Sequence, residues 1–169
     1  MKKKLSLLLL VCATLLSSCI GNKQSTSSTA GLIWSKLTIL TERSTKVNIT
    51  NDRDSAVVIL YNTGSFFNPH SKDAYIDTLS TFFTSSEKDS LASLARDLIV
   101  NPAKIKGFCT EFVGDLQLSL YYGEQFNLSC HYSSVCNWSE LSDKTKLFNN
   151  ILQRRLKPLY NISEQKHHK

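Results

Sequence analysis

The chain has 169 residues, of which 41% are hydrophobic and 20% are charged. This length holds one domain of ordinary size, and the low content of glycine (6) and proline (3) excludes a collagen-like, low-complexity or wholly disordered chain. The formal net charge is +6, and Lys2, Lys3 and Lys4 contribute three of these charges. The excess that remains without them is too small to indicate nucleic acid or a strongly anionic partner.

The N-terminus is typical of a signal peptide. The basic run Lys2-Lys3-Lys4 precedes an apolar run over residues 5–16, which as a helix would span only about 18 Å. A bilayer core of about 30 Å needs roughly twenty residues. We therefore expect residues 1–18 to be a cleaved signal peptide and not a permanent membrane helix.

The end of this segment, Leu16-Ser17-Ser18-Cys19, resembles the lipobox of bacterial lipoproteins. The resemblance implies cleavage before Cys19, attachment of a diacylglycerol to its thiol and a stable anchor of two or three acyl chains. In such proteins an aspartate directly after the lipidated cysteine is the usual signal for retention in the inner membrane. Cys19 is followed by Ile20 and Gly21 instead, so the resemblance favours the outer membrane of the cell envelope. The alternative is an ordinary secreted protein, cleaved near Ser18, with Cys19 free to form a disulfide.

The segment after Cys19 is rich in serine and threonine and has no apolar period, so residues 19–31 are expected to form a lipidated tether. A single globular domain is expected over residues 32–160, followed by a polar tail over residues 161–169.

Alternating apolar residues predict the first strands of this domain. Period-two patterns cover residues 36–41 and 46–50, with a polar turn after the second. The β-branched run over residues 56–61 is typical of a more central strand. Residues 74–83 alternate less cleanly and form a candidate fourth strand.

A helix follows, and its apolar stripe repeats every 3.6 residues: Leu91, Leu94, Ala95, Leu98 and Ile99. Thr84 and Glu87 have the spacing of a capping box at the start of this helix. Asn101-Pro102 ends it, because proline disfavours helical geometry in the residue before it.

Two further strands are expected to form a hairpin, with Leu116, Leu118 and Leu120 in the first strand and residues 126–132 in the second. Both apolar sets share one face only if the loop has an odd number of residues. A loop over residues 121–123 meets this condition and pairs Leu118 with Phe126, and a loop over residues 122–124 meets it too.

A second helix is expected to begin after Ser139 or Ser142 and to end before Pro158, with one stripe formed by Leu141, Phe148, Ile151, Leu152 and Leu156. The order of elements predicts an α+β fold in which a small antiparallel sheet has two helices packed on one face.

The cysteines left after the anchor are Cys109, Cys130 and Cys136, which allow one disulfide. Extension of the hairpin register brings Cys109 near Cys136 and leaves Cys130 as a small buried hydrophobe. The rival pair, Cys130 with Cys136, needs only a local loop. We favour the pair Cys109 and Cys136.

The residues that carry chemistry form no catalytic pattern along the sequence. Cys130 and His131 are neighbours on a strand and point to opposite faces, and His70 is a lone histidine in a loop. Neither the cysteine spacing nor the terminal His167-His168 matches a metal site, so we expect no metal and no cofactor.

Paired aromatic residues are the remaining sign of recognition. Phe66-Phe67 lies close to His70, and Tyr121-Tyr122 lies at the predicted hairpin tip, which makes these five residues candidates for partner binding. The leading hypothesis is a membrane-anchored, non-enzymatic module that binds a protein or another envelope component. The alternative is a small periplasmic hydrolase or thiol-dependent enzyme that uses Cys130 or another free thiol with His70.

Overall fold

The computed structural model describes residues 33–41, 44–62, 75–104, 109 and 114–167. The expected signal peptide, the whole tether over residues 19–31 with Cys19, and Phe66, Phe67 and His70 lie outside these residues. Within them the chain forms, in order, β1 (Lys36–Thr41), β2 (Thr45–Thr50), β3 (Ser55–Asn62), β4 (Tyr75–Phe82), α2 (Ser85–Val100), β5 (Leu116–Tyr122), β6 (Phe126–Tyr132), the short 3-10 helix η2 (Trp138–Glu140) and α3 (Asp143–His167).

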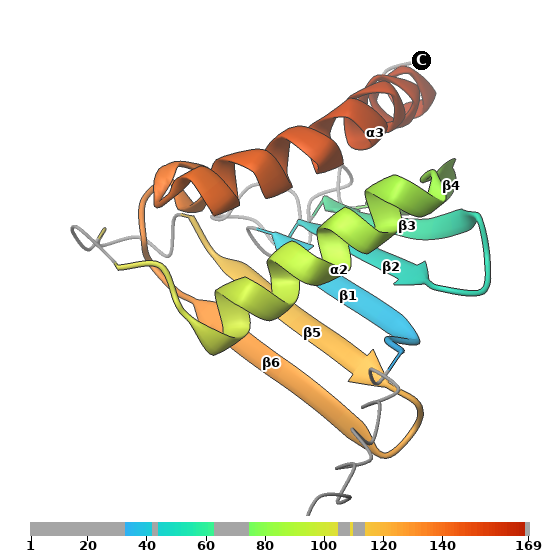
Figure 1. Cartoon of the computed structure of the whole chain (residues 1–169). Helices are drawn as coiled ribbons and strands as arrows, with labels where there is room; N and C mark the ends of the chain where they lie inside the picture. Colours follow the sequence, from blue (N-terminus) through green and yellow to red (C-terminus); the bar gives the residue numbers. More distant parts are fainter. Residues whose placement is uncertain (1–32, 42–43, 63–74, 105–108, 110–113, 168–169) are drawn as a thin grey trace, which may run out of the picture. The chain divides into compact units, whose positions relative to one another are not determined.

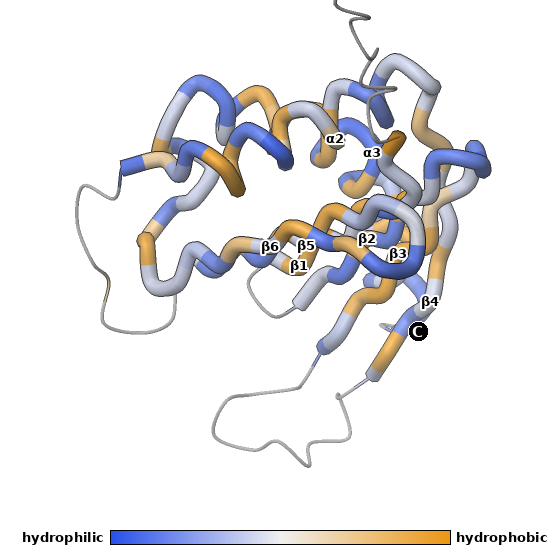
Figure 2. Tube along the Cα trace, turned by 60° about the horizontal axis from the view of Figure 1, so that its bottom comes forward, coloured by the Kyte–Doolittle hydropathy of each residue, from blue (hydrophilic) through white to orange (hydrophobic). Residues whose placement is uncertain are grey.

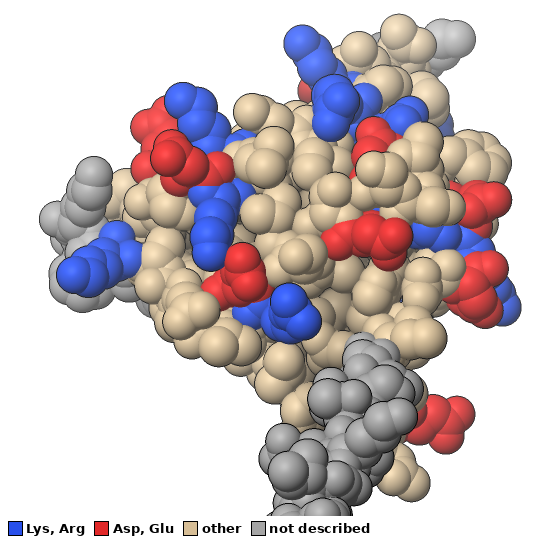
Figure 3. Space-filling view, in the orientation of Figure 1, with Lys and Arg blue, Asp and Glu red and all other residues tan. Residues whose placement is uncertain are grey.

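The strands form one six-stranded antiparallel sheet in the order β4-β3-β2-β1-β5-β6. Both α2 and α3 lie on the same face of this sheet (Figure 1), and a side view shows two layers (Figure 2). The predicted α+β fold, with two helices on one face of an antiparallel sheet, is confirmed. On the helical side, charges of both signs are interspersed (Figure 3).

The core lies between the sheet and the helices, and the period-two patterns determine which strand residues enter it. Leu37, Ile39, Val47 and Ile49 alternate with residues that are less buried, and all four are at most 1% exposed. Because side chains of a strand point alternately to its two faces, one face of β1 and β2 is buried against the helices and the other is not.

The first helix follows its sequence signals closely. Thr84 is the N-cap, and its hydroxyl accepts a hydrogen bond from the Glu87 amide while the Glu87 carboxylate accepts one from the Thr84 amide. This is the predicted capping box. The helix ends at Val100, directly before Asn101 and Pro102, and Leu91, Ala95 and Leu98 of the predicted stripe are buried.

The position of β3 differs from the prediction of a central strand. It is the second strand from one edge, and β1 and β2 are central. Its apolar run does not reflect burial on both faces, because Val57 is 44% exposed on the uncovered side while Ala56 and Val58 are buried on the other. Thus β3 has apolar side chains on both faces, although only its helical face is buried.

The hairpin of β5 and β6 has a three-residue loop, but the loop is shifted from the predicted one. Tyr121 and Tyr122 belong to β5, and Leu118 pairs with Cys130 instead of Phe126. The odd loop length keeps both apolar sets on one face, as parity requires. Several loops satisfy this parity rule, and the observed one is the loop over residues 123–125, in which Gly123 has φ of +67°.

The last helix corrects two predictions, its end before Pro158 and the polar tail over residues 161–169. Ser142 precedes it, and the Ser142 hydroxyl accepts a hydrogen bond from the Thr145 amide. The helix then continues through Pro158 to His167. Leu159 and Ser163 are buried beyond the proline, so tertiary packing stabilises the segment against the cost of proline in a helix interior.

A disulfide joins Cys109 and Cys136, whose Cα atoms are 5.2 Å apart, and Cys130 is free. The pair is the one favoured above, although the register that suggested it is shifted. The Cys109 amide donates to the Ser134 carbonyl, which brings the two segments together beyond the last strand pair. Gly114 adjoins this region with φ of +79°, and a Cβ atom there would collide with the Cys136 carbonyl.

Within the described part of the chain, no helix combines the length and the apolarity that a membrane crossing requires.

Candidate functional site

Among the described residues, no helix covers the side of the sheet turned away from α2 and α3. We call it the open face and define it by the strand side chains that alternate with the buried ones. Its residues on β3 and β4 include three of the exposed large hydrophobic side chains, Val57 (44%), Ile76 (67%) and Phe82 (67%). Apolar side chains on an exposed surface are typical of sites where another molecule binds.

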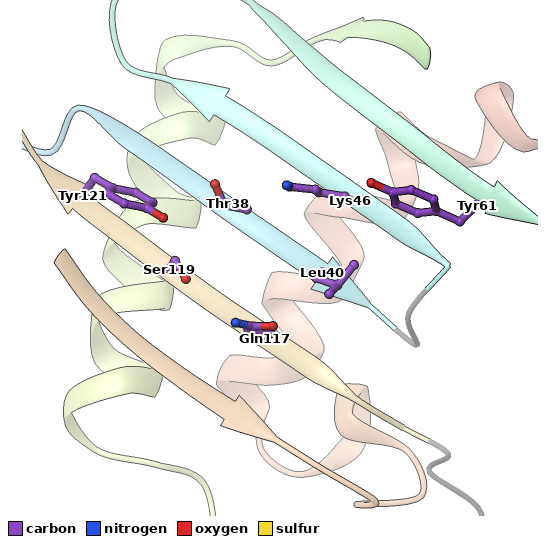
Figure 4. A pocket seen from close by; sticks show the side chains of 7 residues that line it. All are labelled: Thr38, Leu40, Lys46, Tyr61, Gln117, Ser119 and Tyr121. Atoms are coloured by element: carbon purple, nitrogen blue, oxygen red, sulfur yellow. The ribbon is translucent and has the colours of Figure 1, made fainter. Parts of the chain in front are cut away.

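A hollow of about 460 Å³ lies on the open face across β1, β2, β3 and β5. It is lined by Thr38, Leu40, Lys46, Tyr61, Gln117, Ser119 and Tyr121. Figure 4 shows Tyr121 and Tyr61 at opposite ends of this group, with Thr38 and Lys46 between them. These residues converge because the register places Ser119 opposite Thr38 and Gln117 opposite Leu40.

The electrostatics of the open face are weakly positive. Lys46 lies within the hollow, and the ammonium group of Lys36 lies 5.3 Å from the centre of the Tyr121 ring, within range of a cation–π interaction. The Thr38 hydroxyl donates to the Asn48 side-chain oxygen at 3.0 Å, which orders the polar side chains beside the hollow. Among the described strand residues of this face there is no carboxylate.

The side chains that line the hollow offer contact area and hydrogen-bonding groups. Tyrosines offer flat amphipathic contact area, and serine, threonine and glutamine side chains offer adaptable hydrogen bonds. Among the residues that line it, no nucleophile is paired with a base. In the described residues as a whole, no group of three histidine, cysteine, aspartate or glutamate side chains is arranged to hold a metal ion.

A second polar cluster joins β4 to the end of α3 around the buried carboxylate of Asp77. Ser163 donates to Asp77 Oδ2, His167 Nε2 lies 3.0 Å from the same oxygen, and Lys166 donates to Oδ1. The ring of His167 also stacks on Tyr75, with 3.6 Å between ring centres. The hydrogen bonds from Lys166 and Ser163 lower the pKa of Asp77 to about 2.

This cluster contains serine, histidine and aspartate, but it is not arranged as a catalytic triad. In a triad the histidine lies between the serine and the aspartate and accepts the serine proton. Here Ser163 and His167 both contact Asp77, so the carboxylate is the centre and the serine hydroxyl donates to it. We interpret the cluster as the contact that holds the last turns of α3 on the sheet.

We expect Asp77→Asn to destabilise the domain at pH 7 and to have little effect near pH 2. The pKa of Asp77 is lowered in the folded state, so its ionised form stabilises the fold above the ordinary pKa of about 3.9. That contribution to stability is lost as the pH falls through the interval from about 4 to about 2. Urea unfolding of the natural protein and of Asp77→Asn at several pH values would show that the difference between their free energies of unfolding shrinks as the pH falls.

Asp52→Asn is the matched control for this experiment, because Asp52 is an exposed aspartate in the β2–β3 turn. The free energy of unfolding of Asp52→Asn should stay close to that of the natural protein at every pH. A stability deficit of Asp77→Asn that did not shrink on acidification would contradict the role given to the Asp77 carboxylate.

The free thiol of Cys130 lacks the features of a nucleophile. It lies on the helical face of β6 opposite Leu118, and burial raises its pKa to about 11. It is therefore a protonated thiol at neutral pH. His131 points to the other face, where its Nε2 lies 3.8 Å from Asp115. Cys130 and His131 therefore do not meet, and His70, the other histidine of the thiol-enzyme hypothesis, lies outside the described residues.

The structure separates the two tyrosines that the sequence had grouped as binding candidates. Tyr121 lines the hollow on the open face, whereas Tyr122 lies on the helical face and contacts Phe126, with 5.8 Å between ring centres. Phe66, Phe67 and His70 remain untested predictions. Sequence reasoning missed Lys46, Tyr61 and the other polar residues of the hollow, although their alternation with the core residues marked them as one face.

Comparisons with protein-family models, with curated proteins and with solved structures find no match to this chain.

Proposed function

We propose that the protein is a membrane-anchored lipoprotein of the cell envelope whose domain is a non-enzymatic binding module, and that its open face docks a partner protein. The observation that carries the binding role is the uncovered sheet face with its hollow between Tyr61 and Tyr121. A sheet that needs only one covered face for stability can use its other face for recognition.

The residues of the open face indicate what kind of surface the partner presents. Two lysines, Lys36 and Lys46, and no carboxylate occur among the strand residues of this face. Opposite charges across an interface favour association and like charges disfavour it. The partner surface should therefore be neutral or acidic. It should offer polar groups that hydrogen-bond the serine and threonine hydroxyls of the hollow, and an apolar part that contacts the tyrosine rings.

Site-specific photo-cross-linking in the native envelope tests the binding role. A photoreactive amino acid in place of Gln117, which is exposed in the hollow, should form a discrete adduct with the partner. The same group in place of Arg96, exposed on α2 on the other side of the domain, should not form that adduct. Adding Tyr61→Ser to the Gln117 variant should remove the adduct, because the partner loses contact area at the hollow. The melting temperature of the domain should not change.

Two results would overturn the binding role. One is the absence of any adduct from Gln117, and the other is an identical set of adducts from Gln117 and Arg96. An adduct that persists with Tyr61→Ser would move the binding surface away from the hollow.

The anchor rests on the lipobox resemblance and has its own test. Labelled palmitate should enter the natural protein and should not enter Cys19→Ala, which should also leave the membrane fraction. Cys130→Ala is the matched control and should incorporate label normally. Label in Cys19→Ala, or its retention in the membrane fraction, would refute the anchor at Cys19.

A further inference from the structure

The strand β4 forms one edge of the sheet, and among the described strands it pairs only with β3. Its register is continuous over eight residue pairs, from Ser55 opposite Phe82 to Asn62 opposite Tyr75, so no bulge interrupts it. An edge strand of this length presents a row of backbone donors and acceptors to any other strand.

One hydrogen bond shows which residues direct their backbone groups outward. The Phe83 amide donates to the Asp54 carbonyl at 3.2 Å, on the β3 side. In an antiparallel pair, successive residues direct their N–H and C=O groups to opposite sides. Those of Thr81, Leu79 and Asp77 therefore face β3, and the groups of the intervening residues face away from the sheet: Ile76, Thr78, Ser80 and Phe82.

Within Tyr75–Phe82, the described edge has no proline and no bulge, and its outward row has no charged side chain. Natural edges are blocked by charged side chains, proline, bulges or short length. The outward row of β4 contains two hydroxyl residues and two large apolar residues, and Ile76 and Phe82 are each 67% exposed. The one charged residue of β4, Asp77, points to the helical face and is bound by Lys166 of the same chain.

We propose that β4 pairs antiparallel with β4 of a second copy, so that two sheets join into one across a twofold axis at Leu79. In this register Ile76 lies opposite Phe82 of the second copy, and Thr78 lies opposite Ser80 of the second copy. Every outward N–H and C=O group from Ile76 to Phe82 then has a partner.

The second copy fits this edge because the sequence of β4 is nearly symmetric about Leu79. Apolar residues meet apolar residues, hydroxyls meet hydroxyls, and no like charges meet across the axis. Shifting the register by two residues in either direction leaves outward groups unpaired and moves Ile76 away from Phe82. An interface of this kind is isologous and closes at two copies, so it does not propagate into a fibre.

Disulfide trapping tests the register in the full-length protein within its own membrane, in a background that carries Cys130→Ser. Copies with Thr78→Cys and copies with Ser80→Cys, distinguished by different tags, should form a mixed disulfide dimer on mild oxidation. Ser129→Cys, on the open face of β6 at the opposite edge, is the control for random collision and should form no dimer.

Charge exchange provides the second test. Phe82→Lys and Ile76→Glu, each made alone at an exposed position, should weaken dimerisation at least about tenfold, because a charge then faces an apolar side chain. The double variant should restore it, since each introduced lysine faces an introduced glutamate of the second copy. The mass of the detergent-solubilised full chain, from analytical ultracentrifugation, is the readout.

Several results would overturn the proposal. They are a monomeric natural protein, equal trapping at Ser129→Cys, or a double variant no more dimeric than the single variants. A cross-link from β4 to a different protein would show that another strand occupies this edge.

Discussion

Replacing Phe148 with alanine is expected to reduce the free energy of unfolding by about 3 to 5 kcal/mol, the largest effect of any single substitution considered for this protein. Phe148 is completely buried in α3 and meets Trp138 edge to face, with 6.4 Å between ring centres. Truncation removes its apolar contacts and leaves a cavity that the rigid sheet cannot fill by collapse. For a domain of this size the melting temperature should fall by roughly 10 to 20 °C.

The neighbouring residue gives a control on the same helix. Leu147 is 52% exposed, so Leu147→Ala should change the free energy of unfolding by less than about 1 kcal/mol. Urea titration of both variants would check the contrast. If the two variants lost similar stability, α3 would not pack on the sheet with Phe148 inward.

Removal of the disulfide is expected to have the second largest effect. The bridge between Cys109 and Cys136 closes a segment with a sequence separation of 27, and the chain-entropy relation gives a stabilisation of about 3 to 4 kcal/mol for such a loop. The variant Cys109→Ser/Cys136→Ser should therefore unfold at a markedly lower urea concentration, and added reductant should shift the natural protein in the same direction.

Cys130, the third cysteine of the domain, provides a control that distinguishes the loss of stability caused by breaking the disulfide from that caused by removing any thiol. Cys130→Ala removes only a half-buried thiol, so it should cost about 1 kcal/mol or less, and reductant should still destabilise this variant. Peptide mapping without reduction should find Cys109 and Cys136 in one linked peptide pair. A free Cys109 peptide would contradict both the bridge and the predicted stability loss.

Local sequence signals predicted most of the secondary structure. The capping box of Thr84 and Glu87 and the proline after Asn101 set the ends of α2 because these interactions involve residues within one helical turn. The alternation in β1 and β2 identified the buried face, since a strand with one covered face needs apolar side chains at every second position.

The departures from prediction arise where distant residues decide between local alternatives. Parity required an odd hairpin loop but could not choose among several, and Tyr121 entered a strand instead of a loop tip. The β-branched run of β3 also predicted a more central strand, whereas β3 lies second from one edge of the sheet. The hydropathy pattern shows how apolar each face of a strand is, but it does not show what covers that face.

The amino-acid sequence by itself determined the α+β class, the buried side of the strands, the limits of α2 and the residues available for the disulfide. Only the tertiary structure decided that α3 continues past Pro158, because Asp77, far away in the chain, binds Ser163 and Lys166. It also decided that Tyr61 and Tyr121 line one hollow. Local propensities act over a few residues, whereas these contacts join segments that become neighbours only when the sheet has formed.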